Sequence, residues 1–247
     1  MLDVIRQIFD GIPERLTDSY YGKKIIAAYL AYGAKYDFCR FYACENSDGS
    51  KGTIHVYYAA MVIDGNVSHE DAVTFINMIK PVTVEVSGET SLQLPEEYQR
   101  HHRTLFRLKQ GDTDIDFHHV KINNCIADSY IVLKESFENM GDFDKWYVDI
   151  SHRIRHGVAE LYLYEKTTVT KSFDIDGYVF LSHIATAASE RGKGTARRLL
   201  RCLAKKYNNE GKEAYLFAHD HRRSFYESIG FEPAEEDILY ETEQMKG

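Results

Sequence analysis

The pattern of apolar and polar positions predicts secondary structure most clearly in the second half of the chain. A mainly apolar run from Tyr178 to Thr186 predicts a strand. A turn with two glycines follows, and a helix is then predicted to begin near Gly194. Its apolar residues recur at helical spacing and should pack on a sheet: Ala196, Leu199, Leu200, Leu203 and Tyr207. This strand, turn and helix are the centre of the predicted fold.

The elements around this unit follow from the same periodicities. Helices are predicted over 126–137, over 143–154 and over 223–228, and strands over 158–165, 169–175, 214–218 and 238–240. Asp176-Gly177 marks a tight turn between two of these strands. The second half therefore reads as a sheet whose strands are interrupted by helices.

The first half shows a similar order of elements. Two helices are predicted in residues 1–34 on either side of Pro13, the first marked by Leu2, Ile5, Ile8 and Phe9 and the second by Ile25, Ile26, Tyr29 and Leu30. Further elements are predicted in this order: a strand over 38–45, one long central strand over 53–63, a helix after 64–67, a strand over 82–86 and a helix starting at Pro95. The run Thr104 to Leu108 then leads to a polar stretch.

Strand, strand, turn, helix and strand thus recur over 38–86 and 159–218, which indicates an internal duplication. The polar stretch from Lys109 to Asp116 marks a boundary. We therefore predict an α+β fold with mixed α/β sheets in two domains, residues 1–115 and 116–247.

Composition narrows the classes of function. The 247 residues carry a net charge of -8, which argues against nucleic acid as a partner. No signal peptide or membrane-length apolar run is present, so we expect a cytoplasmic protein that does not bind membranes. The four cysteines are scattered without Cys-x-x-Cys spacing, which predicts reduced thiols rather than zinc ligands or disulfides.

The turn after the 178–186 strand has the chemistry of an anion site. It reads Arg191-Gly192-Lys193-Gly194-Thr195-Ala196, and no acidic residue stands between Arg191 and Lys206. Glycines let backbone N–H groups approach a ligand, and the following helix adds the positive end of its dipole. The spacing of a Walker loop is absent, and Arg197 stands where a dinucleotide fingerprint needs a small residue.

Arg191, Gly194 and Ala196 resemble the acyl-CoA pyrophosphate loop of the GNAT N-acetyltransferases. About 25 residues further on, the segment 225–231 is similar to that family's second signature, a tyrosine-bearing helix that ends at Gly-Phe. The two motifs stand in the family's order and spacing. The resemblance implies a GNAT acyl-CoA N-acyltransferase fold for the second half, with acetyl-CoA as cosubstrate.

The resemblance also implies roles for single residues. Acetyl-CoA would be bound by the loop, by main-chain groups of the preceding strand, and by a position where relatives frequently have Asn: Arg191, Gly192, Lys193, Gly194, Thr195, Ala196, Ile184, Thr186 and His219. Tyr226 matches the family's tyrosine that serves as general acid toward the CoA sulfur. No metal is expected, since His219-Asp220-His221 without further ligands is more typical of a polar loop.

The general base stays open. The 178–186 strand carries no acid, and in a regular strand His183 would point to the opposite side from Ser182 and Ile184. A buried, hydrogen-bonded imidazole is therefore favoured over a base at His183. Glu160 acting through a water, His219, or a water chain alone are the other candidates.

The first half lacks this chemistry. In place of the basic loop it has Asp64-Gly65-Asn66-Val67-Ser68, and Ser68 with Asp71 has the pattern of a helix capping box. We interpret this half as a degenerate GNAT-like domain, with an unrelated α+β domain as the alternative.

The leading hypothesis for function is transfer of an acetyl group from acetyl-CoA to a primary amine of a small molecule or peptide. A non-catalytic acyl-CoA-binding or interaction protein is the alternative, because the strand carboxylate is missing. Whether the chain forms a homodimer is left open by the sequence.

Overall fold

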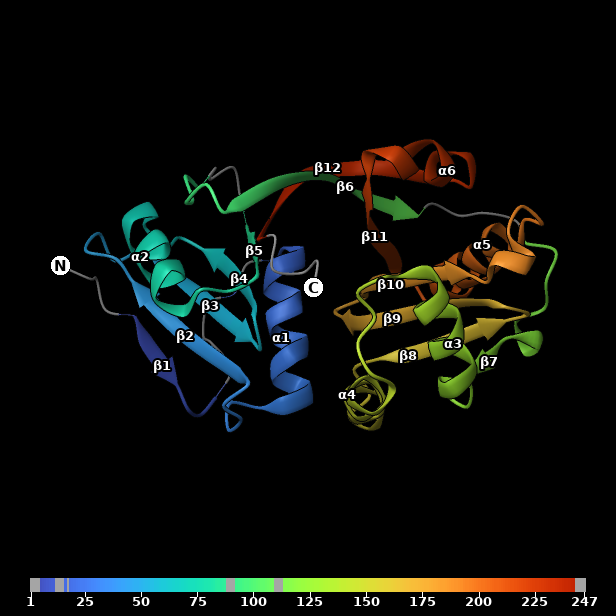
Figure 1. Ribbon diagram of the computed structural model, residues 1–247, viewed down its shortest axis with the longest axis horizontal. Coiled ribbons are helices and arrows are strands. Elements are labelled where there is room, and N and C mark those ends of the chain that lie inside the picture. Colours follow the sequence, from blue (N-terminus) through green and yellow to red (C-terminus); the bar gives the residue numbers. More distant parts are fainter. Residues whose placement is uncertain (1–4, 12–15, 17, 88–91, 109–112, 243–247) are drawn as a thin grey trace. The chain divides into compact units, whose positions relative to one another are not determined.

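The computed structural model describes residues 5–11, 16, 18–87, 92–108 and 113–242 (Figure 1). Contacts between residues divide the chain into two compact units. Unit 1 comprises residues 1–102 and 238–247, and unit 2 comprises residues 103–237.

Unit 1 contains a sheet in the order β1-β2-β3-β4-β5-β12. The strands are β1 (Arg6–Ile8), β2 (Cys39–Glu45), β3 (Lys51–Tyr57), β4 (Ala60–Gly65), β5 (Thr83–Val86) and β12 (Phe231–Thr242). Neighbours are antiparallel except β4 and β5, which run parallel and are joined through α2 (His69–Ile79). This is the crossover that a parallel pair requires.

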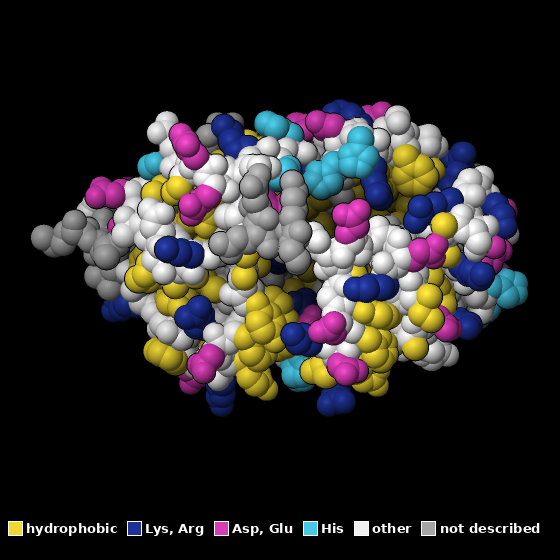
Figure 2. Space-filling model, in the orientation of Figure 1, with side chains coloured by type: hydrophobic (Ala, Val, Ile, Leu, Met, Phe, Trp, Pro, Cys, Tyr) yellow, Lys and Arg dark blue, Asp and Glu magenta, His cyan; other side chains and the backbone are white. Residues whose placement is uncertain are grey.

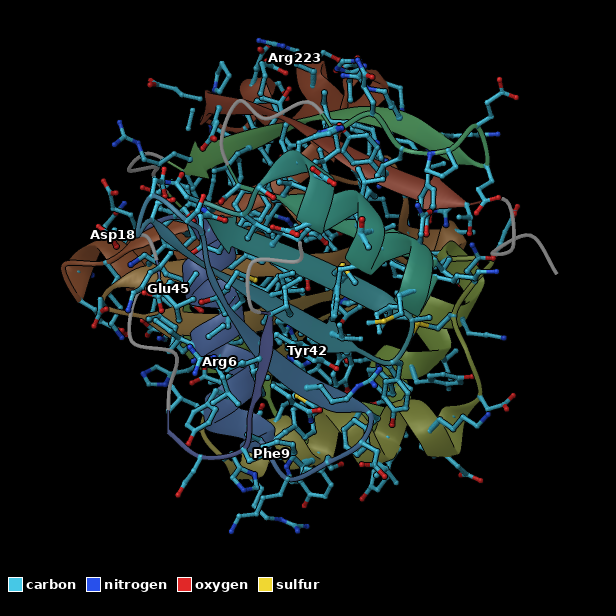
Figure 3. All side chains as sticks on the ribbon, turned by 90° about the vertical axis from the view of Figure 1, so that its left-hand side faces the viewer. Arg6, Phe9, Asp18, Tyr42, Glu45 and Arg223 are labelled. Atoms are coloured by element: carbon cyan, nitrogen blue, oxygen red, sulfur yellow. The ribbon has the colours of Figure 1, made fainter. Side chains whose placement is uncertain are left out.

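The two helices of unit 1 cover opposite faces of this sheet. Phe41 and Tyr42 are adjacent on β2 and therefore point to opposite sides. The ring of Phe41 lies 5.7 Å from Tyr29 of α1 (Tyr20–Tyr32), whereas Tyr42, labelled in Figure 3, lies 4.9 Å from Phe75 of α2. The two helices confirm those predicted from the sequence, one marked by Ile25, Ile26, Tyr29 and Leu30 and one after residues 64–67.

Unit 2 contains a sheet in the order β6-β11-β10-β9-β8-β7. Its strands are β6 (Tyr98–Leu108), which starts in unit 1, β7 (Lys121–Ile122), β8 (Glu160–Tyr164), β9 (Thr167–Ile175), β10 (Tyr178–Thr186) and β11 (Glu213–His219). Only β10 and β11 are parallel, and α5 (Thr195–Asn209) joins them. Unit 2 therefore repeats the arrangement of unit 1, three antiparallel strands followed by a helix and a parallel strand.

Helices cover both faces of this sheet as well (Figure 1). Leu199, Leu200, Leu203 and Tyr207 of α5 are at most 1% exposed and pack with Val179 and Leu181 of β10, as the sequence predicted. On the other face lie α3 (Ile126–Ser136) and α4 (Phe143–Arg155). There Leu133 packs with Ala185, and Trp146 packs against Leu161 and Leu163. The short helix α6 (Arg223–Ser228) follows β11.

Each unit takes its last strand from the other half of the sequence. In unit 1, Leu239, Tyr240 and Glu241 of β12 pair with β5, and the buried Tyr240 hydroxyl accepts the backbone N–H of Leu92 at 3.0 Å. In unit 2, residues 103–108 of β6 pair with β11. The units therefore divide within β6 and β12, whereas the sequence placed the boundary at 115/116 and expected two contiguous domains.

Three sequence predictions in unit 1 are wrong. Residues 6–8 form a strand paired with β2 instead of part of a helix, and Leu2 lies outside the described residues. The segment 53–63 is a hairpin of β3 and β4 instead of one strand, because Tyr58 adopts a left-handed conformation (φ 49°) without a glycine. No helix starts at Pro95, since β6 begins at Tyr98.

Candidate functional site

Strands β10 and β11 separate after a short parallel pairing. Among the described residues they pair only from Tyr178↔Glu213 to Phe180↔Tyr215, although β10 continues to Thr186 and β11 to His219. The other edge of β10 is held by β9 as far as Thr186. The facing edge of β10 beyond Phe180 therefore offers backbone N–H and C=O groups to a ligand.

The loop after β10 leads into an uncapped helix end. Gly192 and Gly194 have φ of 77° and 78°, a conformation that favours glycine. Gly194 is the N-cap of α5 and provides no side-chain hydrogen bond. The N–H groups of the first turn have no partner within the helix, so they and the helix dipole favour an anion here.

The loop's own side chains brace it against neighbouring elements. Arg191 Nε donates to the carbonyl of Thr186 at 3.0 Å, and its Nη2 donates to Ser136 Oγ at 3.3 Å. Thr195 Oγ1 donates to Glu165 Oε2 at 3.2 Å, while Lys193 pairs with Glu190 at 2.9 Å. These side chains fix the loop, which leaves the backbone as its ligand-facing part.

A cleft of about 610 Å³ lies between the end of β10, the loop, the end of α3 and α6. This volume is in the range of small-molecule sites. Its wall combines the end of α3, the end of β10, the loop and α6: Ser136, Phe137, Ile184, Ala185, Thr186, Glu190, Arg191, Gly192, Gly194, Thr195, Ala196, Arg197, His221, Arg222, Phe225, Tyr226, Ser228 and Ile229.

Tyr226 is the buried phenol of this wall. It is 5% exposed, and its ring lies between Phe106 and Phe231 at centroid distances of 5.9 and 5.5 Å. Burial raises the pKa of Tyr226 above its ordinary value, and the charge and hydrogen bond of Arg222 partly oppose this. The phenol is therefore protonated at neutral pH and able to donate a proton.

Positive charge gathers at the α6 side of the cleft. Figure 2 shows histidine side chains exposed where β11 leads into α6, with Lys and Arg side chains beside them. The exposed Arg197, His221 and Arg222 belong to the cleft wall. Arg197 and Arg222 supply positive charge for an anionic ligand beyond the reach of the loop, and Arg222 Nε donates to His221 Nε2 at 3.3 Å.

Two residues expected at the site are not in the cleft wall. Lys193 forms an ion pair with Glu190. His219 stacks with His221 at a centroid distance of 6.0 Å, and of these two histidines it is His221 that lines the cleft. The wall residues that the sequence reasoning missed include Ser136 and Phe137. They lie about 55 residues before the loop, and no local pattern marks them.

Glu160, one of the candidates for the general base, lies away from the cleft. Glu160 is outside the cleft wall, pairs with Lys171 at 2.8 Å and accepts from the Tyr162 hydroxyl. Burial opposes its ionisation, but the hydrogen bonds from Lys171 and Tyr162 outweigh it and lower the pKa of Glu160. This carboxylate is engaged in the sheet instead of facing a substrate.

His183 departs from the expected regular strand. It has φ of 47° and lies at a register shift between β10 and β9. Its Nδ1 lies 2.9 Å from Ser182 Oγ, so the expectation that the two side chains point to opposite sides is wrong. The side chain is exposed, which also corrects the expectation of a buried histidine.

Unit 1 differs from unit 2 at the corresponding place. There β4 and β5 stay paired along the whole of β5, and Ser87 N–H continues the ladder to Ile63 at 2.9 Å. The N-terminus of α2 is capped, because Ser68 Oγ accepts from Asp71 N–H at 3.1 Å, as the sequence predicted. The described part of unit 1 therefore has neither the separated strands nor the open helix end.

No group of three His, Cys, Asp or Glu side chains that could hold a metal ion occurs among the described residues. Within the same residues, no helix has the length and apolar character needed to cross a membrane.

Residues 145–233 match the family model of the acetyltransferase (GNAT) domain. This span covers α5, the glycine loop and Tyr226. The predicted GNAT domain in the second half is therefore confirmed. No curated protein matches the chain.

Solved structures similar to this one are GNAT proteins. A GCN5-related N-acetyltransferase from Sphaerobacter thermophilus aligns over 89% of this chain and 84% of its own, with a TM-score of 0.60 and 14% identity. A putative GNAT acetyltransferase from Novosphingobium aromaticivorans DSM 12444 aligns over 74% and 84%, with a TM-score of 0.54 and 12% identity.

A tandem GNAT protein from the clavulanic acid biosynthesis pathway aligns over 96% of this chain and 98% of its own, with a TM-score of 0.54 and 9% identity. At these identities the likeness is one of fold. The predicted GNAT fold with mixed sheets is confirmed.

Proposed function

We propose that this chain, whose residues 145–233 match a GNAT domain, moves an acetyl group from acetyl-CoA to a primary amine. The acceptor would be a small molecule or a peptide. One observation carries the proposal: the end of β10 beyond its pairing with β11, the uncapped end of α5 and Tyr226 meet in a single cleft.

The residues of the cleft fit acetyl-CoA. The N–H groups at the start of α5 and the backbone of Gly192 and Gly194 would hold the pyrophosphate. Main-chain groups of Ile184 and Thr186, on the free edge of β10, would align the pantetheine arm. Arg197 and Arg222 would pair with phosphate charge.

When bound, acetyl-CoA supplies a thioester whose acetyl group an amine can take. Tyr226 is proposed to donate a proton to the departing thiolate, because its burial keeps the phenol protonated. The wall residues around Tyr226 exclude water from this end of the cleft. No role in proton transfer is assigned to Glu160, since it is paired with Lys171.

Unit 1 is proposed to be a degenerate GNAT-like copy that does not bind acetyl-CoA. Its paired strands and its capped helix support this interpretation, and Glu70 and Asp71 place acidic side chains in the first turn of α2. Unit 1 repeats the order of strands and helix found in unit 2, which argues against the alternative that it is an unrelated α+β domain. A cytoplasmic location is part of the proposal, supported by buried cysteines that are not joined in disulfides: Cys39, Cys44, Cys125 and Cys202.

Release of CoA from acetyl-CoA, followed over a panel of primary amines, tests the enzyme against the non-catalytic alternative. We expect amine-dependent release by the wild type. Tyr226→Phe should lower kcat about 100-fold while the dissociation constant of acetyl-CoA changes less than about threefold, because the phenol acts mainly in the transition state. Binding of acetyl-CoA without release on any amine would favour the binding protein.

A further inference from the structure

An extra residue interrupts β10 beside the cleft. Ser182 lies opposite Thr170 of β9 and Ala185 lies opposite Thr168, so β10 advances three residues while β9 advances two. This is a β-bulge, and His183 within it has φ of 47°. A bulge changes the direction of the side chains that follow it and is common beside functional sites.

His183 is not itself in the cleft wall, but the bulge places its imidazole against a residue that is. Its ring lies edge-on to Phe137 at a centroid distance of 6.1 Å, and Phe137 belongs to the cleft wall. The next residue, Ile184, lines the cleft as well. His183 therefore lies where the free edge of β10 begins to face the ligand.

One nitrogen of this imidazole is already held. Nδ1 lies 2.9 Å from Ser182 Oγ, and Ser182 Oγ lies 2.6 Å from Ser172 Oγ on β9. If Nδ1–H donates to Ser182 and Ser182 donates to Ser172, Nε2 keeps its lone pair. The two serines can thus hold the tautomer in which Nε2 is able to accept a proton.

The charges near His183 come from α4. Burial by the surrounding protein lowers the pKa of His183 below its ordinary 6.5, Arg153 lowers it further, and Asp149 opposes both. Arg153 and Asp149 form an ion pair at 3.3 Å, which limits the effect of each. Phe137 of α3 and the two serines carry no charge. The lowered pKa favours the neutral imidazole, the form in which a ring nitrogen can accept a proton.

We propose that Nε2 of His183 accepts the proton that the acceptor's ammonium loses before attack, with Ser182 and Ser172 as positioning residues. The assignment rests on the proposed function. The amine nitrogen then forms the bond to the acetyl carbon as the carbon–sulfur bond breaks. The thiolate takes a proton from Tyr226, the second amine proton goes to water, and both side chains exchange protons with solvent, so one proton is released per transfer.

His183→Asn is the variant best suited to test this. Asparagine tolerates the left-handed conformation and can still bond Ser182, but it has no basic nitrogen. At pH 7 we expect kcat/KM for the amine to fall about 100-fold, while acetyl-CoA shifts the melting temperature as in the wild type. The wild-type kcat/KM should level off above the pKa of His183, whereas the variant should keep rising toward the pKa of the amine.

Two further variants sharpen the result. Ser182→Ala should lower kcat/KM less than His183→Asn and shift the acid limb of the pH profile, which a merely structural role would not do. His118→Gln is the matched control, because His118 is exposed in the short 3-10 helix Phe117–His119, whereas the ring of His183 contacts the wall residue Phe137. It should leave both rate and profile unchanged.

The outcomes separate the two levels of the proposal. Amine-dependent transfer by the wild type with an unchanged rate and profile in His183→Asn would overturn the assignment and leave the proposed function standing. Absence of transfer on every amine would contradict the proposed function, and the assignment with it. Should His183→Asn fail to fold, an NMR titration of the wild-type histidines decides: His183 must titrate below its ordinary pKa of 6.5, and a higher value overturns the assignment.

Discussion

Gly194→Glu is expected to abolish the stabilisation by acetyl-CoA while leaving the fold intact. At a ligand concentration of about 100 times the dissociation constant, binding stabilises the wild type by about 2.7 kcal/mol. For a chain of this size that corresponds to a rise in melting temperature of about 5–10 °C. The substitution places a carboxylate at the helix end where the pyrophosphate is proposed to bind.

The cost to the apo protein follows from the backbone. Gly194 has φ of 78°, which costs a residue with a Cβ about 1–2 kcal/mol, and a Cβ there meets no atom within 4 Å. The negative charge at the α5 N-terminus returns about 0.3–1 kcal/mol. If the dissociation constant rises about 100-fold, the stabilisation by the same ligand concentration falls to about 0.4 kcal/mol.

Gly49→Glu is the matched control. Gly49 has φ of 81° in the β2–β3 turn of unit 1, and a Cβ there also meets no atom within 4 Å. It carries the same backbone cost and the same added charge, away from the cleft. Differential scanning calorimetry with and without acetyl-CoA compares the variants. Equal ligand-induced shifts in Gly194→Glu and Gly49→Glu would refute the placement of the pyrophosphate at α5.

Two further predictions concern groups outside the cleft. Because the folded-state pKa of Glu160 is lowered, its contribution to stability is present above its ordinary pKa of 4.5 and is lost as pH falls below that value. Glu160→Gln should therefore flatten the profile of melting temperature against pH between about pH 3 and 6. An unchanged slope would contradict a stabilising role for the hydrogen bonds from Lys171 and Tyr162. Tyr240→Phe should destabilise unit 1 by about 1–3 kcal/mol, because the buried N–H of Leu92 loses its acceptor; urea unfolding measures this, and amide exchange of Leu92 no faster than in the wild type would argue against it.

The region around the cleft was predictable because its signals are local and repeated. The 178–186 strand and the 223–228 helix were placed at the residues where they occur, and α5 began one residue after the expected Gly194. Glycines mark the turn, and a long apolar period marks the helix.

Elsewhere the deciding interactions are not local. Three residues form β1 because β2 offers an edge, and the apolar pattern at 2–9 was too short to tell strand from helix. Tyr58 turns a hairpin without any residue that signals a turn. The start of β6 reads Gln99-Arg100-His101-His102, whose polarity hid a strand. The bulge at His183 likewise depends on pairing with β9, which no pattern within β10 reveals.

Isothermal titration calorimetry of the intact chain with acetyl-CoA tests the central claim most directly. Unit 2 has the separated strands and the uncapped helix, whereas in unit 1 the strands are paired and Ser68 caps the helix. We predict one acetyl-CoA bound per chain. A stoichiometry of two would contradict the interpretation of unit 1 as a degenerate copy, and no binding would contradict the proposed function altogether.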